Sequence, residues 1–187
     1  MIRRFITDII TYDGTQLSSL WAFRNFGLQG DSIVSFQGPC RVNITEMVDL
    51  EDVKNNAPIY SEKMLHFIIE HFDLDLEKTI VRQRLFIAII KDAVQQHTGA
   101  VLRRDGDDLF YNEKKLSVSI ATLTPVSTMI HTALNVISDN VPVPAVGLAD
   151  LGLEIDKMPA LGAAICGLYA GECSEILMAR CKVRGVK

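Results

Sequence analysis

The sequence has few of the short motifs that identify nucleotide-binding or hydrolytic sites. It contains no phosphate-binding Gly-x-x-x-x-Gly-Lys-Ser/Thr loop, no Gly-x-Gly-x-x-Gly segment and no Gly-x-Ser-x-Gly elbow. Several nucleotide-binding and hydrolase mechanisms are therefore disfavoured. Its 4 cysteines include no Cys-x-x-Cys pair, which argues against a zinc ribbon or a dithiol redox site.

Positive charge is also scarce, because 19 lysines and arginines face 23 aspartates and glutamates. Nucleic-acid-binding domains normally carry a basic face, so we expect no nucleic-acid partner. The longest apolar-rich stretch, Met158 to Tyr169, contains Gly162 and Gly167 and is too short to cross a bilayer. The first residues lack the apolar core and cleavage site of a secretory signal. We therefore expect a cytoplasmic protein with no membrane partner.

Length and composition predict one domain spanning residues 1–187, since 48% of the residues are apolar and can form a substantial core. Alternating β-branched segments and two helical periodicities predict an α+β fold with a mixed, mainly antiparallel sheet covered by helices. The strand edges and the small residues of the last helix would permit a homodimer. We expect strands at Arg4–Thr11, Asp31–Phe36, Arg41–Val48, Lys63–Phe72, Ala100–Arg104, Asp108–Tyr111, Lys115–Leu123 and Thr128–Ile137, and helices at Thr15–Phe26, Asp49–Val53, Asp75–His97 and Met158–Lys182.

Two segments hold most of the candidate functional residues. The stretch Gly106–Ile120 is typical of a strand, a tight polar turn and a second strand, and Ile130–Val136 predicts a third. This pattern places Asp108, Lys115, His131 and Asn135 on neighbouring strands. Polar groups between apolar strands are costly to bury without partners, so we expect a binding site there.

Lys115 is the first candidate for chemistry. In a strand it shares one face with Ser117, and an ammonium beside a hydroxyl can stabilise a phosphate, a carboxylate or a developing oxyanion. The alternative is a solvated lysine at a turn. Asp108 follows Asp107, and paired carboxylates can hold Mg²⁺ or orient a ligand hydroxyl, although Gly-Asp-Asp is also ordinary turn composition.

His131 and Asn135 could line a pocket or could be satisfied core residues. The spacing within His66–His71 matches no metalloprotease arrangement, and we predict no metal site. Cys40, in Gly-Pro-Cys, is expected in an exposed loop, where a neighbouring cation could lower the thiol pKa and make it a nucleophile. A purely structural cysteine is the alternative.

Taken together, these elements resemble the catalytic domain of biotin and lipoate protein ligases and of octanoyltransferases, a fold related to class II aminoacyl-tRNA synthetases. The resemblance rests on Asp108-Leu109, on Lys115-Leu116 seven positions later, and on His131-Thr-Ala-Leu-Asn-Val136. It covers roughly residues 64–153. The whole chain also resembles an uncharacterised, mainly archaeal family, DUF366, through segments such as Gly38-Pro-Cys40 and Met47–Asp52.

The resemblance implies an acyl or biotinyl ligase or transferase that acts on a small carboxylic acid or its thioester. ATP and Mg²⁺ would be cosubstrate and cofactor, and an acyl-carrier, lipoyl or biotinyl domain would be the acceptor. It implies that Lys115 contacts the carboxylate and the adenylate phosphate, with Asp108, Ser117, His131 and Asn135 around the substrate.

Two departures favour the alternative of a non-catalytic binding or assembly module on the same fold. Val118 stands where the ligases have glycine, and no cysteine occurs near Pro144–Val146, where octanoyltransferases carry their nucleophile.

Overall fold

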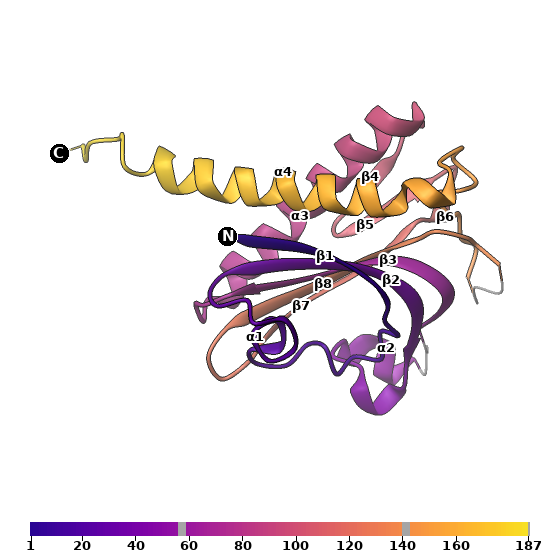
Figure 1. Cartoon of the computed structure of the whole chain (residues 1–187), viewed down its shortest axis with the longest axis horizontal. Helices are drawn as coiled ribbons and strands as arrows, with labels where there is room; N and C mark the ends of the chain where they lie inside the picture. The colour runs from indigo at the N-terminus through magenta and orange to yellow at the C-terminus, as the bar shows by residue number, and fades with distance from the viewer. Residues whose placement is uncertain (56–58, 140–142, 187) are drawn as a thin grey trace.

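A five-stranded sheet forms the middle layer of the molecule (Figure 1). The structure is a computed structural model that describes residues 1–55, 59–139 and 143–186. The strand order is β1-β2-β3-β8-β7, parallel between β1 and β2 and antiparallel elsewhere. The strands are β1 (Ile2–Ile9), β2 (Ser32–Val42), β3 (Ile59–His71), β7 (Ser117–Leu123) and β8 (Thr128–Asn135), and a small antiparallel sheet contains β4 (Arg103–Asp105), β5 (Asp108–Tyr111) and β6 (Lys114–Lys115).

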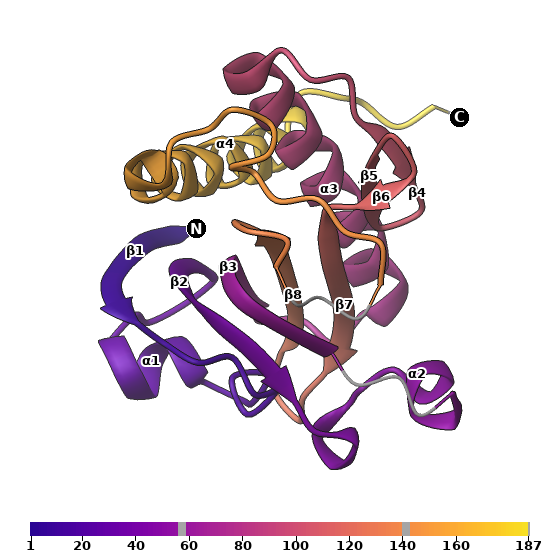
Figure 2. The same cartoon turned by 90° about the vertical axis from the view of Figure 1, so that its right-hand side faces the viewer.

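Helices cover both faces of the main sheet, as Figure 2 shows. The two long helices, α3 (Leu76–Thr98) and α4 (Met158–Ala179), lie on one face. Three short elements lie on the other face: α1 (Trp21–Phe26), the 3-10 turn η1 (Ile44–Glu46) and α2 (Leu50–Lys54). A further 3-10 turn, η2 (Ile155–Lys157), leads into α4. The predicted mixed α+β class with a mainly antiparallel sheet is confirmed.

Alternation along the strands gives the sheet two different faces. On β3, Leu65, Phe67 and Ile69 are fully buried and pack in the core beneath α3 and α4. The intervening Met64 and Ile68 belong to a second, smaller core on the face of α1. The functional cavity described below opens on this second face, where side chains of α1 and the N-terminal loops leave the sheet partly uncovered.

The long helix α3 begins and ends where the sequence predicts. Asp75 is its N-cap and accepts a hydrogen bond from the Lys78 N–H at 2.9 Å. Gly99 ends it with a left-handed φ of 71°. A branched ion pair joins this helix to the end of β3, because one Asp73 oxygen contacts both Lys78 and Arg82.

The helix predicted for Thr15–Phe26 is wrong in its first half. Helix α1 begins only at Trp21, and Leu20 before it has a left-handed φ of 62°. The cause is a buried carboxylate: Glu70 accepts hydrogen bonds from the Leu20 N–H at 2.8 Å and from the Ser127 hydroxyl at 2.7 Å. Satisfying this carboxylate holds the chain out of helical geometry at Leu20.

The break predicted at Gly38-Pro39 is also wrong, and so is the separate strand at Arg41–Val48. Strand β2 continues to Val42, with a register shift against β3 between Gly38 and Cys40. Such bulges tolerate proline within a sheet. Here Tyr12 pairs in parallel with Cys40 of β2, donating its N–H to the Pro39 carbonyl and accepting the Arg41 N–H.

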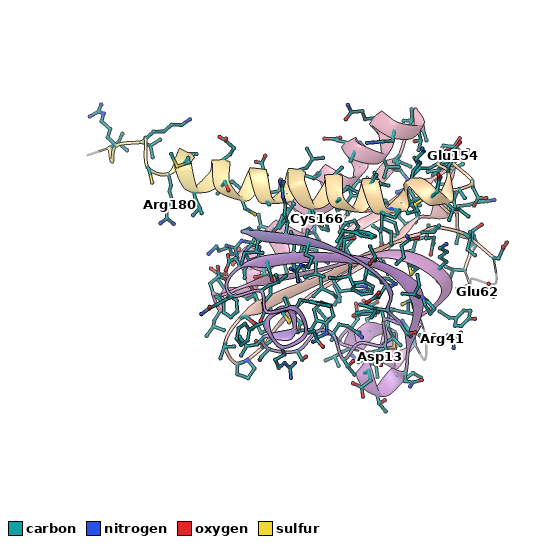
Figure 3. The ribbon with its side chains drawn as sticks, viewed as in Figure 1. Asp13, Arg41, Glu62, Glu154, Cys166 and Arg180 are labelled. Atoms are coloured by element: carbon teal, nitrogen blue, oxygen red, sulfur yellow. The ribbon has the colours of Figure 1, made fainter. Side chains whose placement is uncertain are left out.

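Helix α4 extends beyond the sheet, and its C-terminal half has no cover (Figure 3). Cys166 lies on the side facing the sheet, whereas Arg180 lies near the free end. Contrary to the expectation that no apolar stretch is long enough, Ile155–Ala179 meets the length and composition of a membrane-crossing helix, with a mean hydropathy of 1.2 and 33% of that window buried. Core helices of soluble proteins pass the same criterion, so this is weak evidence of a span.

Substitution of Gly38 by alanine should destabilise the fold by about 2 kcal/mol, because a Cβ there would collide with the Ile10 carbonyl oxygen. Urea unfolding measures this change. The matched control is Gly171→Ala on α4, where no atom lies within 4 Å of the new Cβ. Removing a helical glycine should stabilise slightly, by about 0.5 kcal/mol. Equal effects of the two variants would contradict the close contact between Gly38 and the Ile10 carbonyl.

Candidate functional site

A cavity of about 370 Å³ lies on the α1 face of the sheet, within the size range of small-molecule sites. Its floor is formed by β7 and β8, one wall by Tyr12 and Cys40, and the opposite rim by η1 and the start of α2. All six residues proposed from the sequence line it: Cys40, Asp108, Lys115, Ser117, His131 and Asn135.

An ion pair between Lys115 and Asp108 lies at one end of the cavity. The Lys115 Nζ is 2.9 Å from the Asp108 Oδ2, and each side chain keeps about a third of its surface accessible. Pairing of β5 with β6 sets this contact, since Phe110 lies opposite Lys115. Burial raises the pKa of Asp108 above its ordinary value, Lys115 opposes that rise, and the charge of Asp107 adds to it.

The backbone of Lys115 is fixed by a segment that runs parallel to it. The Lys115 N–H donates to the Pro144 carbonyl at 2.9 Å, and the Lys115 carbonyl accepts the Val146 N–H at 3.0 Å. Ala145 thereby lies beside Lys115 and lines the cavity. This is the position where the resemblance to octanoyltransferases would place a nucleophilic cysteine, and it carries only a methyl group.

His131 lines the floor of the cavity, and it is bonded to a second histidine, His66, which is fully buried and does not line the cavity. His66 Nδ1 lies 3.1 Å from His131 Nε2, and His66 Nε2 lies 3.1 Å from the Gly38 carbonyl oxygen. Burial lowers the pKa of His66 to about 4, although its hydrogen bond to Gly38 opposes this. Burial and the neighbouring His66 hold the pKa of His131 well below its ordinary value. Both imidazoles are therefore neutral at neutral pH.

Tyr12 covers this pair. Its ring is stacked on that of His131 with 3.5 Å between centroids and 12° between planes, and the ring of Phe36 stacks on His66 from the other side. Neither Tyr12 nor His66 was proposed as a site residue from the sequence. The available signal was the placement of His66 and His131 on one face of two adjacent strands, which becomes visible only once β3 is paired with β8.

Ser117 and Asn135 reach the cavity but are already used within the fold. The Ser117 hydroxyl accepts the Leu109 N–H at 2.9 Å and is fully buried. The Asn135 amide group donates weakly to the Lys115 carbonyl, at 3.4 Å. Both residues therefore hold the strands around Lys115 in place, and the Asn135 side-chain oxygen has no hydrogen-bond partner among the described residues.

Cys40 is not the exposed loop thiol that the sequence suggested. It lies on β2 with no exposed surface, and burial raises its pKa to about 12. A thiol with such a pKa stays protonated at neutral pH and is a poor nucleophile. The neighbouring Arg41 does not compensate, because its side chain lies over the ring of Tyr60.

Acidic side chains dominate the charge of the cavity. Five carboxylates line it against one lysine in the described part of the chain, namely Glu46, Asp49, Asp52, Asp107 and Asp108. They are spread around the rim, and among the described residues no three His, Cys, Asp or Glu side chains are grouped to hold a metal ion. Ser61 also lines the cavity, and its buried hydroxyl has no hydrogen-bond partner in the part of the chain that the structure describes.

This arrangement occurs on the fold of the biotin and lipoate protein ligases. Biotin protein ligase from Aquifex aeolicus in complex with biotin and ATP superposes with a TM-score of 0.57 at 13% identity, over 92% of this chain and 72% of that one. Protein Ta0514 from T. acidophilum with bound lipoic acid gives 0.59 at 15%, over 91% and 87%. Such low identities establish the fold alone.

The chain belongs to the DUF366 family, a domain of unknown function, whose model matches residues 1–184. The uncharacterised protein MJ0805 of Methanocaldococcus jannaschii is 43% identical over 161 residues, covering 82% of this chain and 72% of that protein. A protein of unknown function from Pyrococcus horikoshi has a solved structure with a TM-score of 0.89 and 36% identity, covering 99% of this chain and 100% of that one.

The buried histidine pair should make the protein acid-labile. Unfolded His66 takes up a proton near pH 6.5, but folded His66 does so only near pH 4, so stability is full above pH 6.5 and falls as the pH drops through this window. The loss attributable to His66 is at most about 3 kcal/mol. Urea unfolding at pH 7 and pH 4.5 measures it.

A His66→Phe variant should show a shallower decline of unfolding free energy over the same pH interval, because one titrating group is gone. Parallel pH profiles for the two proteins would show that the pKa of His66 is the same in the folded and unfolded states.

Proposed function

We propose that this chain is a ligase that activates a small carboxylic acid with ATP for transfer to an acceptor. The single observation that carries this proposal is the Lys115–Asp108 ion pair at the end of a cavity of about 370 Å³, on a ligase-like fold. The carboxylate would attack the α-phosphorus of ATP, and pyrophosphate would leave. An acceptor amine would then attack the acyl-adenylate carbonyl and release AMP.

The ammonium of Lys115 is suited to this role because it is fixed and its side chain keeps about a third of its surface accessible. Its backbone is bonded on both sides, and Asp108 orients its side chain. On substrate binding the ammonium can contact both the ligand carboxylate and the phosphate that becomes bonded to it. A preorganised cation at the developing negative charge is commonly the largest contribution to such catalysis.

The thioester-transfer branch of the resemblance is less well supported. It requires a thiolate near Lys115, and Ala145 occupies that place. Cys40 is the one thiol among the described residues lining the cavity, and burial keeps it protonated. We therefore favour direct use of a free acid over an acyl-enzyme intermediate.

The residues present fit a nucleotide-bound Mg²⁺. Magnesium in such sites is held by one or two carboxylates together with substrate phosphates. Asp108 contacts Lys115, Asp107 precedes it in the chain, and the Gln83 amide group donates to Asp107 at 2.8 Å, which fixes that carboxylate. When bound, the ion would offset the negative charge of the phosphates against the acidic lining.

A non-catalytic binding protein is the second candidate, and the charge of the cavity favours it. Five lining carboxylates oppose an anionic adenylate, and the side chain of Val118 occupies space at the floor where ligases have glycine. A small neutral or zwitterionic ligand would meet less repulsion. This candidate predicts ligand binding without any turnover of ATP.

Substitution of Lys115 by alanine should lower the rate of ATP–pyrophosphate exchange, measured over a panel of small carboxylic acids, by about a hundred-fold or more. The matched control is Lys114→Ala. Lys114 is the preceding residue and is exposed, so its loss should leave the exchange rate unchanged.

Equal loss in both variants would indicate a general charge effect rather than a contact with the reacting groups. Absence of exchange with every acid in the wild-type protein, together with binding that survives Lys115→Ala, would remove the ligase proposal.

A further inference from the structure

The hydrogen bonds of His66 fix which nitrogen of each histidine carries a proton. The Gly38 carbonyl oxygen can only accept, so His66 Nε2 must carry the hydrogen. Since this ring is neutral, His66 Nδ1 is bare and accepts. The group facing it, His131 Nε2, must therefore be the donor.

The second nitrogen of His131 is consequently an acceptor. A neutral imidazole carries one ring hydrogen, and that of His131 lies on Nε2. His131 Nδ1 has no hydrogen-bond partner within residues 1–55, 59–139 and 143–186. The residue lines the cavity, and Tyr12 covers the face of its ring rather than its edge. The free acceptor is thus available to a ligand.

The separation of His131 from Lys115 sets the size of such a ligand. Asn135 contacts the Lys115 carbonyl, and it lies four residues from His131 on the same face of β8. Four residues of strand span about 13 Å, which separates the backbone of His131 from the part of β8 that contacts the Lys115 backbone. A molecule anchored at Lys115 and reaching His131 must therefore be elongated, like a medium-length acyl chain.

We propose that the ligand of this cavity carries an N–H or O–H group at the end remote from its carboxylate, and that His131 Nδ1 accepts its hydrogen. His131 is thus a specificity-determining residue that favours hydroxylated, amide-bearing or urea-bearing acids over acids with a plain hydrocarbon end. His66 is a positioning residue, because it acts only by fixing the tautomer of His131. The inference that the ligand has a carboxylate rests on the proposed function, whereas the role of His131 Nδ1 as a hydrogen-bond acceptor does not.

The first test is the tautomer itself. Long-range ¹H–¹⁵N correlation spectra of the histidine side chains should show His131 with a bare Nδ1 and a protonated Nε2 at neutral pH. In His66→Phe the fixed acceptor is gone, and the spectra should show His131 redistributing between tautomers. A protonated Nδ1 in the wild-type protein would overturn the inference.

The second test compares ligands that differ by one donor. Octanoate and ω-hydroxyoctanoate share a carboxylate, while imidazolidinone and its N,N′-dimethyl derivative have none and probe His131 alone. Calorimetry and the ¹⁵N shift of Nδ1 should show the donor-bearing member of each pair binding roughly ten-fold more tightly. His131→Phe, which keeps an aromatic ring beneath Tyr12, should reduce the ratio to about one. His97→Gln, outside the cavity, should leave it unchanged.

The outcomes separate this inference from the proposed function. Binding of imidazolidinone without binding of either acid would support the acceptor and refute the carboxylate site. Equal binding of the two acids, still dependent on Lys115, would refute the acceptor and leave the ligase proposal standing. If no probe binds and Nδ1 does not shift, the inference is overturned even where the predicted tautomer is seen.

Discussion

The contact on which this site depends is the hydrogen bond between two imidazole rings buried in the middle of the sheet. His66 and His131 would each be costly to bury alone. Bonded to each other, to the Gly38 carbonyl and beneath the Tyr12 ring, they become a permanent polar floor in an apolar layer. Low dielectric strengthens such a chain as long as each member is satisfied. His131, which lines the cavity, has no hydrogen-bond partner for Nδ1 among the described residues.

Two parts of the cavity lining present different polar groups. At one end a single ammonium, held by Asp108, can meet negative charge, while the floor offers an uncharged acceptor. Between them the rim carries carboxylates that repel anions. An elongated molecule with one acidic end would be held in a single orientation by this polarity.

The sequence predicts the elements whose signals are local. The N-cap Asp75, the apolar stripe of α3 and its end at Gly99 all follow from residues near one another in the chain. The placement of Lys115 beside Asp108 was predictable for the same reason, since one hairpin joins them. Resemblance to ligases then indicated the fold correctly.

The features that were predicted wrongly depend on contacts between residues far apart in the chain. Glu70 prevents helical geometry at Leu20, 50 residues away in the chain. Tyr12 stabilises β2 across Gly38-Pro39, so a segment that reads locally as a break is a continuous strand with Cys40 buried in it. The pairing of His66 with His131 joins residues 65 positions apart. No local pattern contains such information, and the roles of Tyr12 and His66 therefore emerge only from the folded structure.

The two walls of the cavity differ in rigidity. The close backbone contact between Gly38 and Ile10 makes one wall rigid, whereas the opposite rim is held by fewer contacts. Backbone hydrogen bonds fix Tyr12 against β2, and two residues earlier the Ile10 backbone lies so close to Gly38 that there is no room for a methyl group. On the facing side, no residue of η1 or α2 is buried, so few contacts oppose a shift of that rim. A ligand of different size would then be accommodated by changes in residues 44–54, while the position of the Tyr12 wall stays the same.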